Sequence, residues 1–299
     1  MDTDADLETL VAQKDHVNVL RYLRVHQLRD PSLAVHHGQA ALKQRSLSDV
    51  TRLAIYEQVA LAALDLQDHT LADECLSKLR EMGVEKESVR FRLLLGRCLE
   101  ASGDTTGASQ LYDTLLKENP ANSVALKRKY CILKSQVGQE IATVAALNEY
   151  LQNNYSDPAA WSEMAKLRME QGDFAKAIYA WEEVLLSAPT DPFVHVSIAE
   201  CYTTVGGLDN LEQARKHFCQ ALELDASYRR AQFGLVVAAN AYVEAASNAS
   251  KKQLVDDFEV QVAKELVKFG AEQAIQAYKG TSMLASVQSL MQEYTEGVK

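Results

Sequence analysis

Apolar residues recur at helical spacing along most of the chain, in pairs of segments separated by a short polar turn. The clearest pair is PAAWSEMAKLRMEQGDFAKAIYAWEEVLLSAPT, which begins at Pro158. Its first segment carries Trp161 and the small residue Ala165. Its second segment carries Trp181, and Gly172 lies in the turn. Small residues let helices approach and glycine permits a tight turn, so the pattern predicts an antiparallel helix pair whose tryptophans fill the space between neighbouring pairs.

The pair repeats along the chain with a period of about 34 residues, which is typical of tetratricopeptide repeats. Pairs begin near residues 53, 89, 124, 158, 192 and 229. Two pairs depart from the template. Gln67 stands where the pair from residue 53 needs a turn glycine, and Gly206-Gly207 opens a turn lengthened by three residues in the pair from 192. We expect Asp209 or Asn210 to be the N-cap of the helix after this longer turn.

These pairs predict an all-α protein, a tetratricopeptide-repeat right-handed superhelical solenoid with atypical capping helices, formed by one continuous domain. The chain is assigned to N-terminal capping helices (1–50), helix-pair repeats (51–270) and a C-terminal capping helix with a tail (271–299). Near the N-terminus we expect one helix up to Leu28 and a second opened by Pro31. Ser250 to Gly270 is the expected second helix of the last pair, and a closing helix follows Gly280.

Composition limits the classes of partner and compartment. The formal net charge of -10 argues against nucleic acid, because such binding needs a basic surface. The five cysteines are widely spaced without a Cys-x-x-Cys pair, which is typical of reduced thiols in a cytosolic protein. The beginning, MDTDADLETL, differs from a signal peptide, and no stretch approaches the roughly 18 apolar residues of a membrane span. We therefore expect a cytoplasmic protein without a transmembrane helix.

Few residues are candidates for chemistry. His36 and His37 are adjacent, so on a helix they diverge by about 100° and cannot share a metal; solvated histidines are favoured. Cys201, His217 and Cys219 fall in one helix pair, but a zinc site needs a fourth ligand and better spacing, so packing cysteines are favoured. No catalytic string such as Gly-x-Ser-x-Gly or His-Glu-x-x-His is present. The sequence predicts no enzyme, no cofactor and no metal.

The remaining candidate is a surface. In a stack of helix pairs the first helices line the concave face, and their second, fifth and ninth positions point into the groove. The residues predicted to bind partners at these positions are Arg90, Leu93, Arg97, Arg128, Ile132, Lys166, Phe193 and Val196. A mixed basic and apolar channel in an acidic protein suits a helix or tail that carries carboxylates. The alternative is a solvated face with long side chains.

Several segments carry a resemblance beyond the repeat template. In chain order they include IYEQVALAALDL from Ile55, LYDTLLKENPANSVALKRK from Leu111, AAWSEMAKL from Ala159, GGLDNLEQARKHFCQAL from Gly206 and RAQFGL from Arg230. Together they closely resemble the second subunit of the endoplasmic reticulum membrane protein complex. The resemblance covers roughly Ile55 to Leu235, and the extended GGLDN turn and the LKRK helix make it specific.

This resemblance implies a non-enzymatic scaffold, peripheral on the cytosolic face of the endoplasmic reticulum membrane and bound to that membrane only indirectly. The family's complex inserts transmembrane segments, including those of tail-anchored and multi-pass clients. The implied partners are the membrane-embedded subunits, gripped through their cytosolic segments, and a second soluble subunit. No nucleic acid, cofactor or covalent step is implied, and an amphipathic partner helix in the groove is the expected contact.

The competing interpretation is a tetratricopeptide co-chaperone or adaptor that binds an acidic peptide tail. Its clamp requires lysine, asparagine, asparagine, lysine and arginine at fixed positions of three successive first helices. The residues at those positions are Leu93, Arg97, Lys129, Ala159 and Glu163. None matches the required type, so the clamp is absent from the sequence.

Overall fold

The computed structural model describes residues 6–84, 87–248 and 256–298, and every regular element within these ranges is an α-helix. The helices are α1 (Leu7–Ala12), α2 (His16–Val25), α3 (Pro31–Leu42), α4 (Asp49–Asp65), α5 (His69–Glu81), α6 (Val89–Ala101), α7 (Thr105–Glu118), α8 (Ser123–Lys134), α9 (Glu140–Asn153), α10 (Pro158–Glu170), α11 (Phe174–Ser187), α12 (Pro192–Val205), α13 (Leu208–Leu224), α14 (Arg229–Ser247), α15 (Asp257–Ala277) and α16 (Leu284–Gly297). The predicted all-α class is confirmed.

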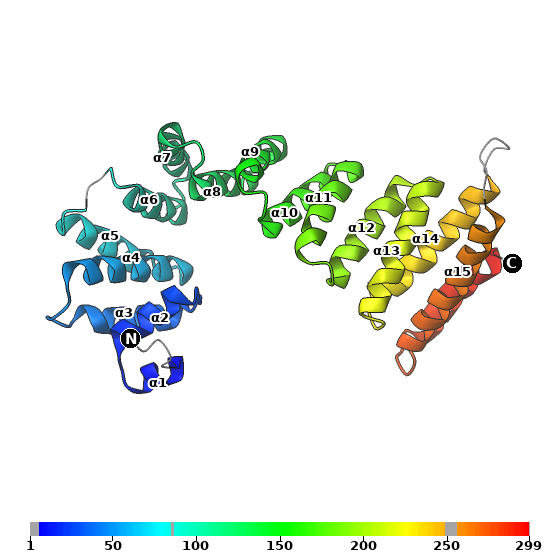
Figure 1. The fold of residues 1–299 in the computed structure, drawn as a ribbon, viewed down its shortest axis with the longest axis horizontal. Helices are drawn as coiled ribbons and strands as arrows, with labels where there is room; N and C mark the ends of the chain where they lie inside the picture. Colours follow the sequence, from blue (N-terminus) through cyan, green and yellow to red (C-terminus); the bar gives the residue numbers. More distant parts are fainter. Residues whose placement is uncertain (1–5, 85–86, 249–255, 299) are drawn as a thin grey trace. The chain divides into compact units, whose positions relative to one another are not determined.

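The chain divides into two compact units, Met1–Asn153 with α1 to α9 and Asn154–Lys299 with α10 to α16 (Figure 1). Within a unit, consecutive helices pack on one another, α4 and α8 both contact α6, and α12 contacts α14. We call the first helix of each predicted pair an A helix (α4, α6, α8, α10, α12, α14) and its partner a B helix. The surface formed by a unit's A helices is its A-helix face. The assignment of the whole chain to one domain stays a prediction.

Tight turns between A and B helices need one residue in the left-handed backbone region. Gly103, Gly138 and Gly172 supply it, with φ of 86°, 82° and 74°. Gln67 takes the same conformation, with φ of 61°, where the sequence lacks a glycine, at a cost of roughly 1 to 2 kcal/mol. Asp104 then caps α7 by accepting a backbone N–H at 2.8 Å. Turn chemistry therefore sets the repeat spacing.

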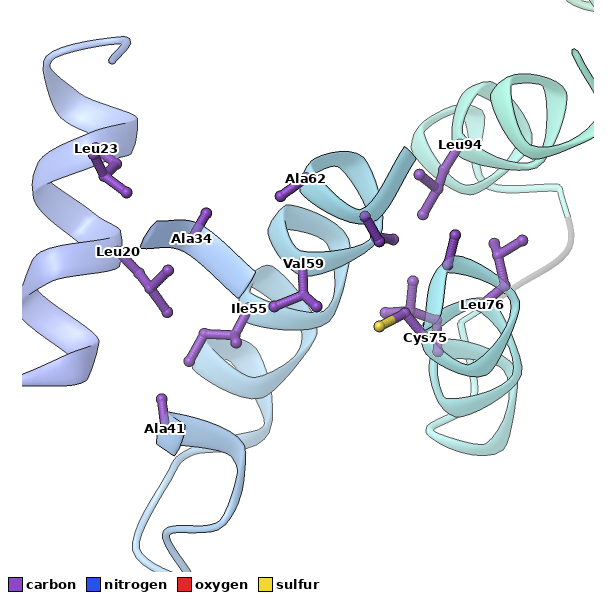
Figure 2. Packing of buried hydrophobic residues seen from close by; sticks show 14 of the residues in the cluster. Leu20, Leu23, Ala34, Ala41, Ile55, Val59, Ala62, Cys75, Leu76 and Leu94 are labelled. Carbon is purple, nitrogen blue, oxygen red and sulfur yellow. The ribbon is translucent and has the colours of Figure 1, made fainter. Parts of the chain in front are cut away.

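The first unit has a continuous apolar core between α2 and α6 (Figure 2). Leu20 and Leu23 of α2 are buried in it, as are Ile55 and Val59 of α4. A Cβ atom at Gly38 of α3 would lie 2.1 Å from Cγ2 of Val59. The glycine therefore lets α3 approach α4 more closely than any side chain would permit.

The second unit packs aromatic rings against small residues. A Cβ atom at Gly234 of α14 would lie 2.2 Å from Cε1 of Phe218, a buried residue of α13. Trp181 of α11 is buried, and its ring meets Phe193 of the next pair edge to face with centroids 5.7 Å apart. Trp181 thus fills the space between two pairs, as the repeat pattern predicts.

Trp161 behaves differently from that prediction. It is only partly buried, and its ring meets Tyr179 of its own pair edge to face at 5.8 Å. Its Nε1 donates a hydrogen bond of 2.8 Å to the carbonyl oxygen of Tyr155. Trp161 therefore stabilises the entry into α10 and its pairing with α11.

The prediction of a single helix up to Leu28 is wrong. The chain from Leu7 to Leu28 forms α1 and α2, separated by a break in which Lys14 adopts a φ of 54°. Asp15 accepts the backbone N–H of Asn18 at 3.2 Å and so begins a new helix. Aspartate competes for backbone N–H groups in this way, and apolar periodicity alone does not detect it.

The predicted end of the second helix of the last pair, at Gly270, is also wrong. Helix α15 continues to Ala277, past the expected end at Gly270; residues 250–255 of the expected helix lie outside the described ranges. A Cβ atom at Gly270 would lie 2.8 Å from Cγ2 of Val236, so this glycine serves a close helix crossing. The closing helix α16 follows Gly280, whose φ is 84°.

The lengthened turn after α12 is a bend with two left-handed glycines, Gly206 and Gly207, at φ of 73° and 84°. Gly207 is the N-cap of α13, so the prediction of Asp209 or Asn210 as N-cap is wrong. Asn210 lies inside the helix and donates Nδ2–H to the carbonyl oxygen of Gly206 at 2.8 Å. The helix starts earlier because both glycines turn the chain before the side-chain caps are reached.

Candidate partner-binding faces

On the A-helix face of the first unit, Arg90 is paired with a carboxylate of the preceding A helix. Its guanidinium binds Glu57 of α4 through two hydrogen bonds, one of 3.2 Å from Nε to Oε1. Arg90 stays 76% exposed, whereas Glu57 is largely covered. The pair neutralises part of the positive charge that the sequence predicts for this face.

Arg128 of α8 is also paired with a carboxylate, and this pair is less exposed than that of Arg90. It forms a bidentate ion pair with Glu100 of α6, and Tyr112 of α7 donates its hydroxyl hydrogen to the same carboxylate at 2.7 Å. The side chains of Arg128 and Glu100 are only 30% and 13% exposed. Hydrogen bonding to Glu100 raises the pKa of Arg128, and burial followed by the bond to Glu100 raises the pKa of Tyr112. Arg128 therefore connects two A helices of its own chain.

Three more predicted residues lie on these helices. Ile132 is buried with Tyr112 and Leu115, and Leu93 packs partly buried against the same cluster. The prediction that Ile132 lines an open groove is therefore wrong, because α8 turns this position toward α7. Arg97 is partly exposed, and no carboxylate in the described ranges forms an ion pair with it. Of the predicted basic residues in this unit, Arg97 is the one left for a partner.

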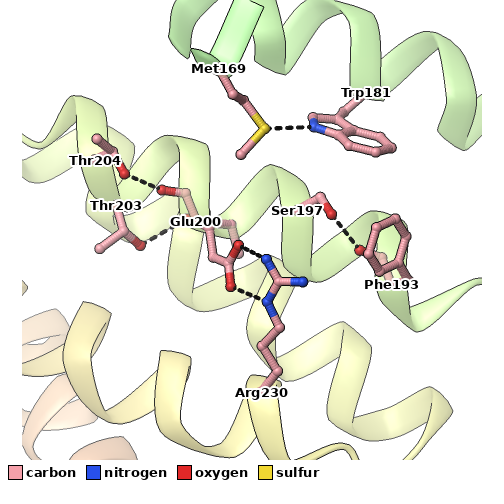
Figure 3. Close-up of polar contacts among 9 residues, drawn as sticks. Met169, Trp181, Phe193, Ser197, Glu200, Thr203, Thr204 and Arg230 are labelled. Carbon is pink, nitrogen blue, oxygen red and sulfur yellow. Dashed lines mark hydrogen bonds and ion pairs between the residues drawn. The ribbon is translucent and has the colours of Figure 1, made fainter. Parts of the chain in front are cut away.

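The A-helix face of the second unit contains an open hollow of about 380 Å³ between α10, α12 and α14. The residues that line it are Met169, Glu200, Thr203, Thr204, Phe218, Gly234 and Val237. The hydroxyls of Thr203 and Thr204 donate to the carbonyl oxygens of Ala199 and Glu200, each at 2.8 Å, so they are satisfied within α12 (Figure 3). Val237 is 41% exposed. The hollow thus offers an apolar surface with few unsatisfied polar groups.

An ion pair borders this hollow. Glu200 of α12 accepts two hydrogen bonds from the guanidinium of Arg230 on α14 (Figure 3). The two side chains are 30% and 49% exposed. Hydrogen bonding to Glu200 raises the pKa of Arg230. The bridge joins successive A helices, as in the first unit, but lies open to solvent.

The predicted residues of the second unit separate into three environments. Phe193 is 39% exposed beside Trp181, with the Arg230 guanidinium 6.0 Å from its ring centroid. Lys166 is exposed and lies 3.6 Å from a carboxylate oxygen of Glu163 on its own helix. Val196 is fully buried in a cluster with α13 and α14, so its predicted exposure is wrong. The valine contributes to packing between pairs.

The sequence prediction missed the acidic partners of the basic residues. A signal is present: an A-helix glutamate is followed about one repeat later by an arginine on the next A helix, in Glu57 with Arg90, Glu100 with Arg128 and Glu200 with Arg230. The spacings differ with helix length, so a fixed period does not show them. Val237 was missed because the pair from residue 229 departs from the template.

Two histidine pairs link helices inside the units. Nδ1 of His195 lies 3.1 Å from Nδ1 of His217, and Nε2 of His195 lies 3.1 Å from the carbonyl oxygen of Pro189. Burial, and then the neighbouring His195, lower the pKa of His217 to about 4. In the first unit Nδ1 of His37 lies 2.9 Å from Nδ1 of His16. His37 is buried, so its prediction as a solvated histidine is wrong.

The cysteines show no reactive environment. Burial raises the pKa of Cys75 to about 12 and those of Cys98 and Cys201 to about 11. Among the residues that the structure describes, no three histidine, cysteine or carboxylate side chains gather in a way that could hold a metal ion. In the same part of the chain, no helix is both long and apolar enough to span a membrane.

Comparison with known proteins decides the family. Residues 67–223 match the model of the EMC2 TPR-like repeat domain, which is more than half of the chain. The chain belongs to the EMC2 TPR-like repeat family. ER membrane protein complex subunit 2 of Xenopus tropicalis is 41% identical over 205 residues, covering 68% of this chain and 67% of the relative. The protein of the same name in Dictyostelium discoideum is 30% identical over 210 residues, covering 70% and 65%.

The EMC2 family match confirms the resemblance found in the sequence and includes the A helices α6, α8, α10 and α12. Helix α14, with Arg230 and Val237, lies beyond the matched region. A solved structure, the C-terminal part of a TPR repeat-containing protein from Cytophaga hutchinsonii, aligns with a TM-score of 0.54 over 94% of this chain and 97% of its own. At 12% identity it shows the fold alone, and the predicted tetratricopeptide solenoid is confirmed.

Proposed function

We propose that this chain is a non-enzymatic scaffold subunit of an endoplasmic reticulum membrane protein complex. It lies on the cytosolic face of that membrane and holds membrane-embedded and soluble partner subunits together. The complex inserts the transmembrane segments of tail-anchored and multi-pass clients, and this subunit contributes no covalent step. Membership is supported by relatives that carry the name ER membrane protein complex subunit 2.

One observation supports partner capture above the others. The A-helix face of the second unit exposes Val237 in the wall of a hollow of about 380 Å³, and Phe193 near the guanidinium of Arg230. An amphipathic helix docks through apolar side chains at successive turns, and such a hollow accepts them. The occupant we propose is a helical cytosolic segment of a membrane-embedded subunit, with one apolar side chain in the hollow and polar residues near Glu200 and Arg230.

The ion pairs favour this contact over an acidic-tail clamp. Arg90, Arg128 and Arg230 already bind carboxylates of their own chain. A carboxylate tail would have to break those bidentate bonds, and in exchange it would form bonds of the same kind. Apolar burial needs no such exchange, so it is the stronger source of partner affinity on these faces.

The test is affinity purification of the tagged chain from detergent-solubilised membranes, followed by mass spectrometry of the bound proteins. Wild type is compared with Val237→Asp, which places a charge in the hollow, and with Leu186→Asp. Leu186 lies on the B helix α11 of the same unit and is 78% exposed, so it controls for an added surface charge.

We expect wild type and Leu186→Asp to recover a stoichiometric set of multi-pass membrane proteins, and Val237→Asp to lose most of it. Circular dichroism checks that both variants keep the wild-type helix content. Recovery of soluble chaperones alone by wild type would contradict the scaffold function. Equal recovery by both variants would contradict only the role of the hollow.

A further inference from the structure

In the first unit, Arg24 of α2 lies within electrostatic range of the ion pair between Glu57 of α4 and Arg90 of α6. Glu57 of α4 is bonded to Arg90 of α6, and Arg21 and Arg24 of α2 lie nearby. Partial desolvation of the Arg24 guanidinium lowers its pKa; Glu57 opposes this change, whereas Arg21 and Arg90 add to it. No carboxylate in the described ranges forms an ion pair with Arg21 or Arg24. The cluster therefore contains one arginine that is paired with Glu57 and, within the described ranges, two arginines without an ion pair.

An apolar pocket of about 270 Å³ adjoins this cluster. Leu53, Leu79, Phe91 and Leu94 line it, and Glu57 and Arg90 form part of its wall. Because those two residues belong to both features, the pocket and the arginine cluster are contiguous. A ligand that enters the pocket meets uncompensated positive charge at its edge.

The packing of α2 on α4 holds the cluster in place. Gln58 of α4 donates Nε2–H to the carbonyl oxygen of Leu20 at 3.2 Å. Leu20 and Leu23 are buried, which fixes the rotation of α2. Arg21 and Arg24 are one turn apart, so they lie on the same side of α2 and stay exposed. The positive charge is thus attached to a rigid part of the core.

We propose that this surface, formed by Arg21, Arg24, Arg90 and the adjoining pocket, docks a short acidic helical segment of a partner protein. One large apolar side chain of the segment enters the pocket. A carboxylate one turn away binds the guanidinium groups of Arg24 and Arg21. Charge complementarity selects this occupant, because a basic or neutral segment would leave two arginines uncompensated beside a buried apolar contact.

The proposal goes beyond the proposed function, because α2 and Glu57 lie outside the matched family region and the second unit contributes nothing to the site. It also differs from the acidic-tail clamp considered for the sequence, which would use α6, α8 and α10. A chain that failed to join a membrane complex would still carry this surface.

The test uses the full chain and two synthetic amphipathic helices of leucine and alanine. The peptides are identical except that one has glutamate and the other lysine at every polar position. Fluorescence anisotropy measures binding at low and high salt. We expect the glutamate peptide to bind at least about tenfold more tightly, with a preference that shrinks as salt screens the charges.

Three variants localise the binding. Arg21→Glu with Arg24→Glu should abolish the preference for the glutamate peptide. Lys43→Glu with Arg45→Glu makes the same charge change at exposed positions of the same unit and should preserve it. Ala54→Phe fills the pocket without changing charge and should weaken both peptides alike.

Three results would overturn the proposal. The first is equal binding of the two peptides by wild type, and the second is an equal loss of binding in both charge-reversal variants. The third is arginine-dependent binding of phosphatidylserine vesicles with no binding of the glutamate peptide, which would assign the cluster to a membrane surface.

Discussion

Two glutamate–arginine bridges, one on each A-helix face, lie in different surroundings. In the first unit the pair of Glu100 and Arg128 is largely covered, and Tyr112 adds a third hydrogen-bonding group from a B helix. In the second unit the pair of Glu200 and Arg230 is more exposed and stands at the edge of an apolar hollow. A bridge turned inward stabilises the stack, whereas a bridge at a rim leaves apolar surface open for a partner.

The difference arises from neighbouring residues. Behind Glu100, the hydroxyl-bearing ring of Tyr112 packs on Gly96, and a Cβ there would lie 2.6 Å from the hydroxyl oxygen. In the second unit, Phe218 of α13 lines the hollow together with Glu200 and packs on Gly234, and its ring carries no hydroxyl. The hydroxyl of Tyr112 therefore ties the first bridge to a buried ring of a B helix.

The largest expected effect on stability comes from removing the indole ring of Trp181 in the second unit. Trp181→Ala should lower the free energy of unfolding by about 3 to 5 kcal/mol, because Trp181 is fully buried between two helix pairs. Trp161→Ala should cost roughly 1 kcal/mol, since Trp161 is only partly buried. Urea unfolding followed by circular dichroism measures both. Equal losses would show that exposure does not distinguish the two rings.

Breaking the two bridges tests the comparison directly. Glu100→Gln should destabilise by about 2 to 3 kcal/mol, because it leaves the covered Arg128 without its counter-charge. Glu200→Gln should cost less than about 1 kcal/mol, since Arg230 can turn to solvent. The same urea titration applies. If Glu200→Gln lost more stability than Glu100→Gln, the bridge of Glu200 and Arg230 would be the one that stabilises the stack.

Acid should affect the second unit through His217. Its pKa of about 4 in the folded chain lies below the ordinary value of 6.5, so the unfolded chain binds more protons between these values. Stability should therefore fall as pH drops from 6.5 toward 4, by about 2 kcal/mol after allowance for partial exposure. Replacement by phenylalanine should flatten this part of the stability profile. An unchanged profile in His217→Phe would remove His217 as its source.

The smallest effect on stability belongs to Arg97→Glu. Arg97 has no ion pair to lose within the described ranges, so the free energy of unfolding should stay within about 0.5 kcal/mol of wild type. If the first face also contacts partners, co-purification should fall. Arg128→Glu is unsuitable for this purpose, because it would break the covered bridge. Loss of stability in Arg97→Glu would place that side chain in the structural network.

Much of the fold follows from the sequence because turns and small residues carry local signals. Gly103 and Gly172 mark turns, and the proline at Pro192 opens a helix, as the pattern indicates. Gly270 misled the prediction because a glycine can end a helix or permit a close crossing. The outcome depends on Val236, which is far away in sequence.

The candidate faces were harder to predict for a physical reason. Helical position alone places Arg128 and Val196 on a face, but burial depends on what the next helix presents. Val196 is covered by α13 and α14, and Arg128 is neutralised by Glu100. Both facts arise from contacts about one repeat away, so a fixed position in the template does not reveal them.

The bidentate bridges also have a mechanical consequence. Two parallel hydrogen bonds between a glutamate and an arginine resist sliding of one A helix along the next, because a shift of a few ångströms would break both at once. A pull applied at one helix pair is then passed to its neighbour as tension, with little stretching at the joint. In the first unit, where bridges join α4 to α6 and α6 to α8, the three helices act as a stiff lever, and a load on one end is transmitted to the other.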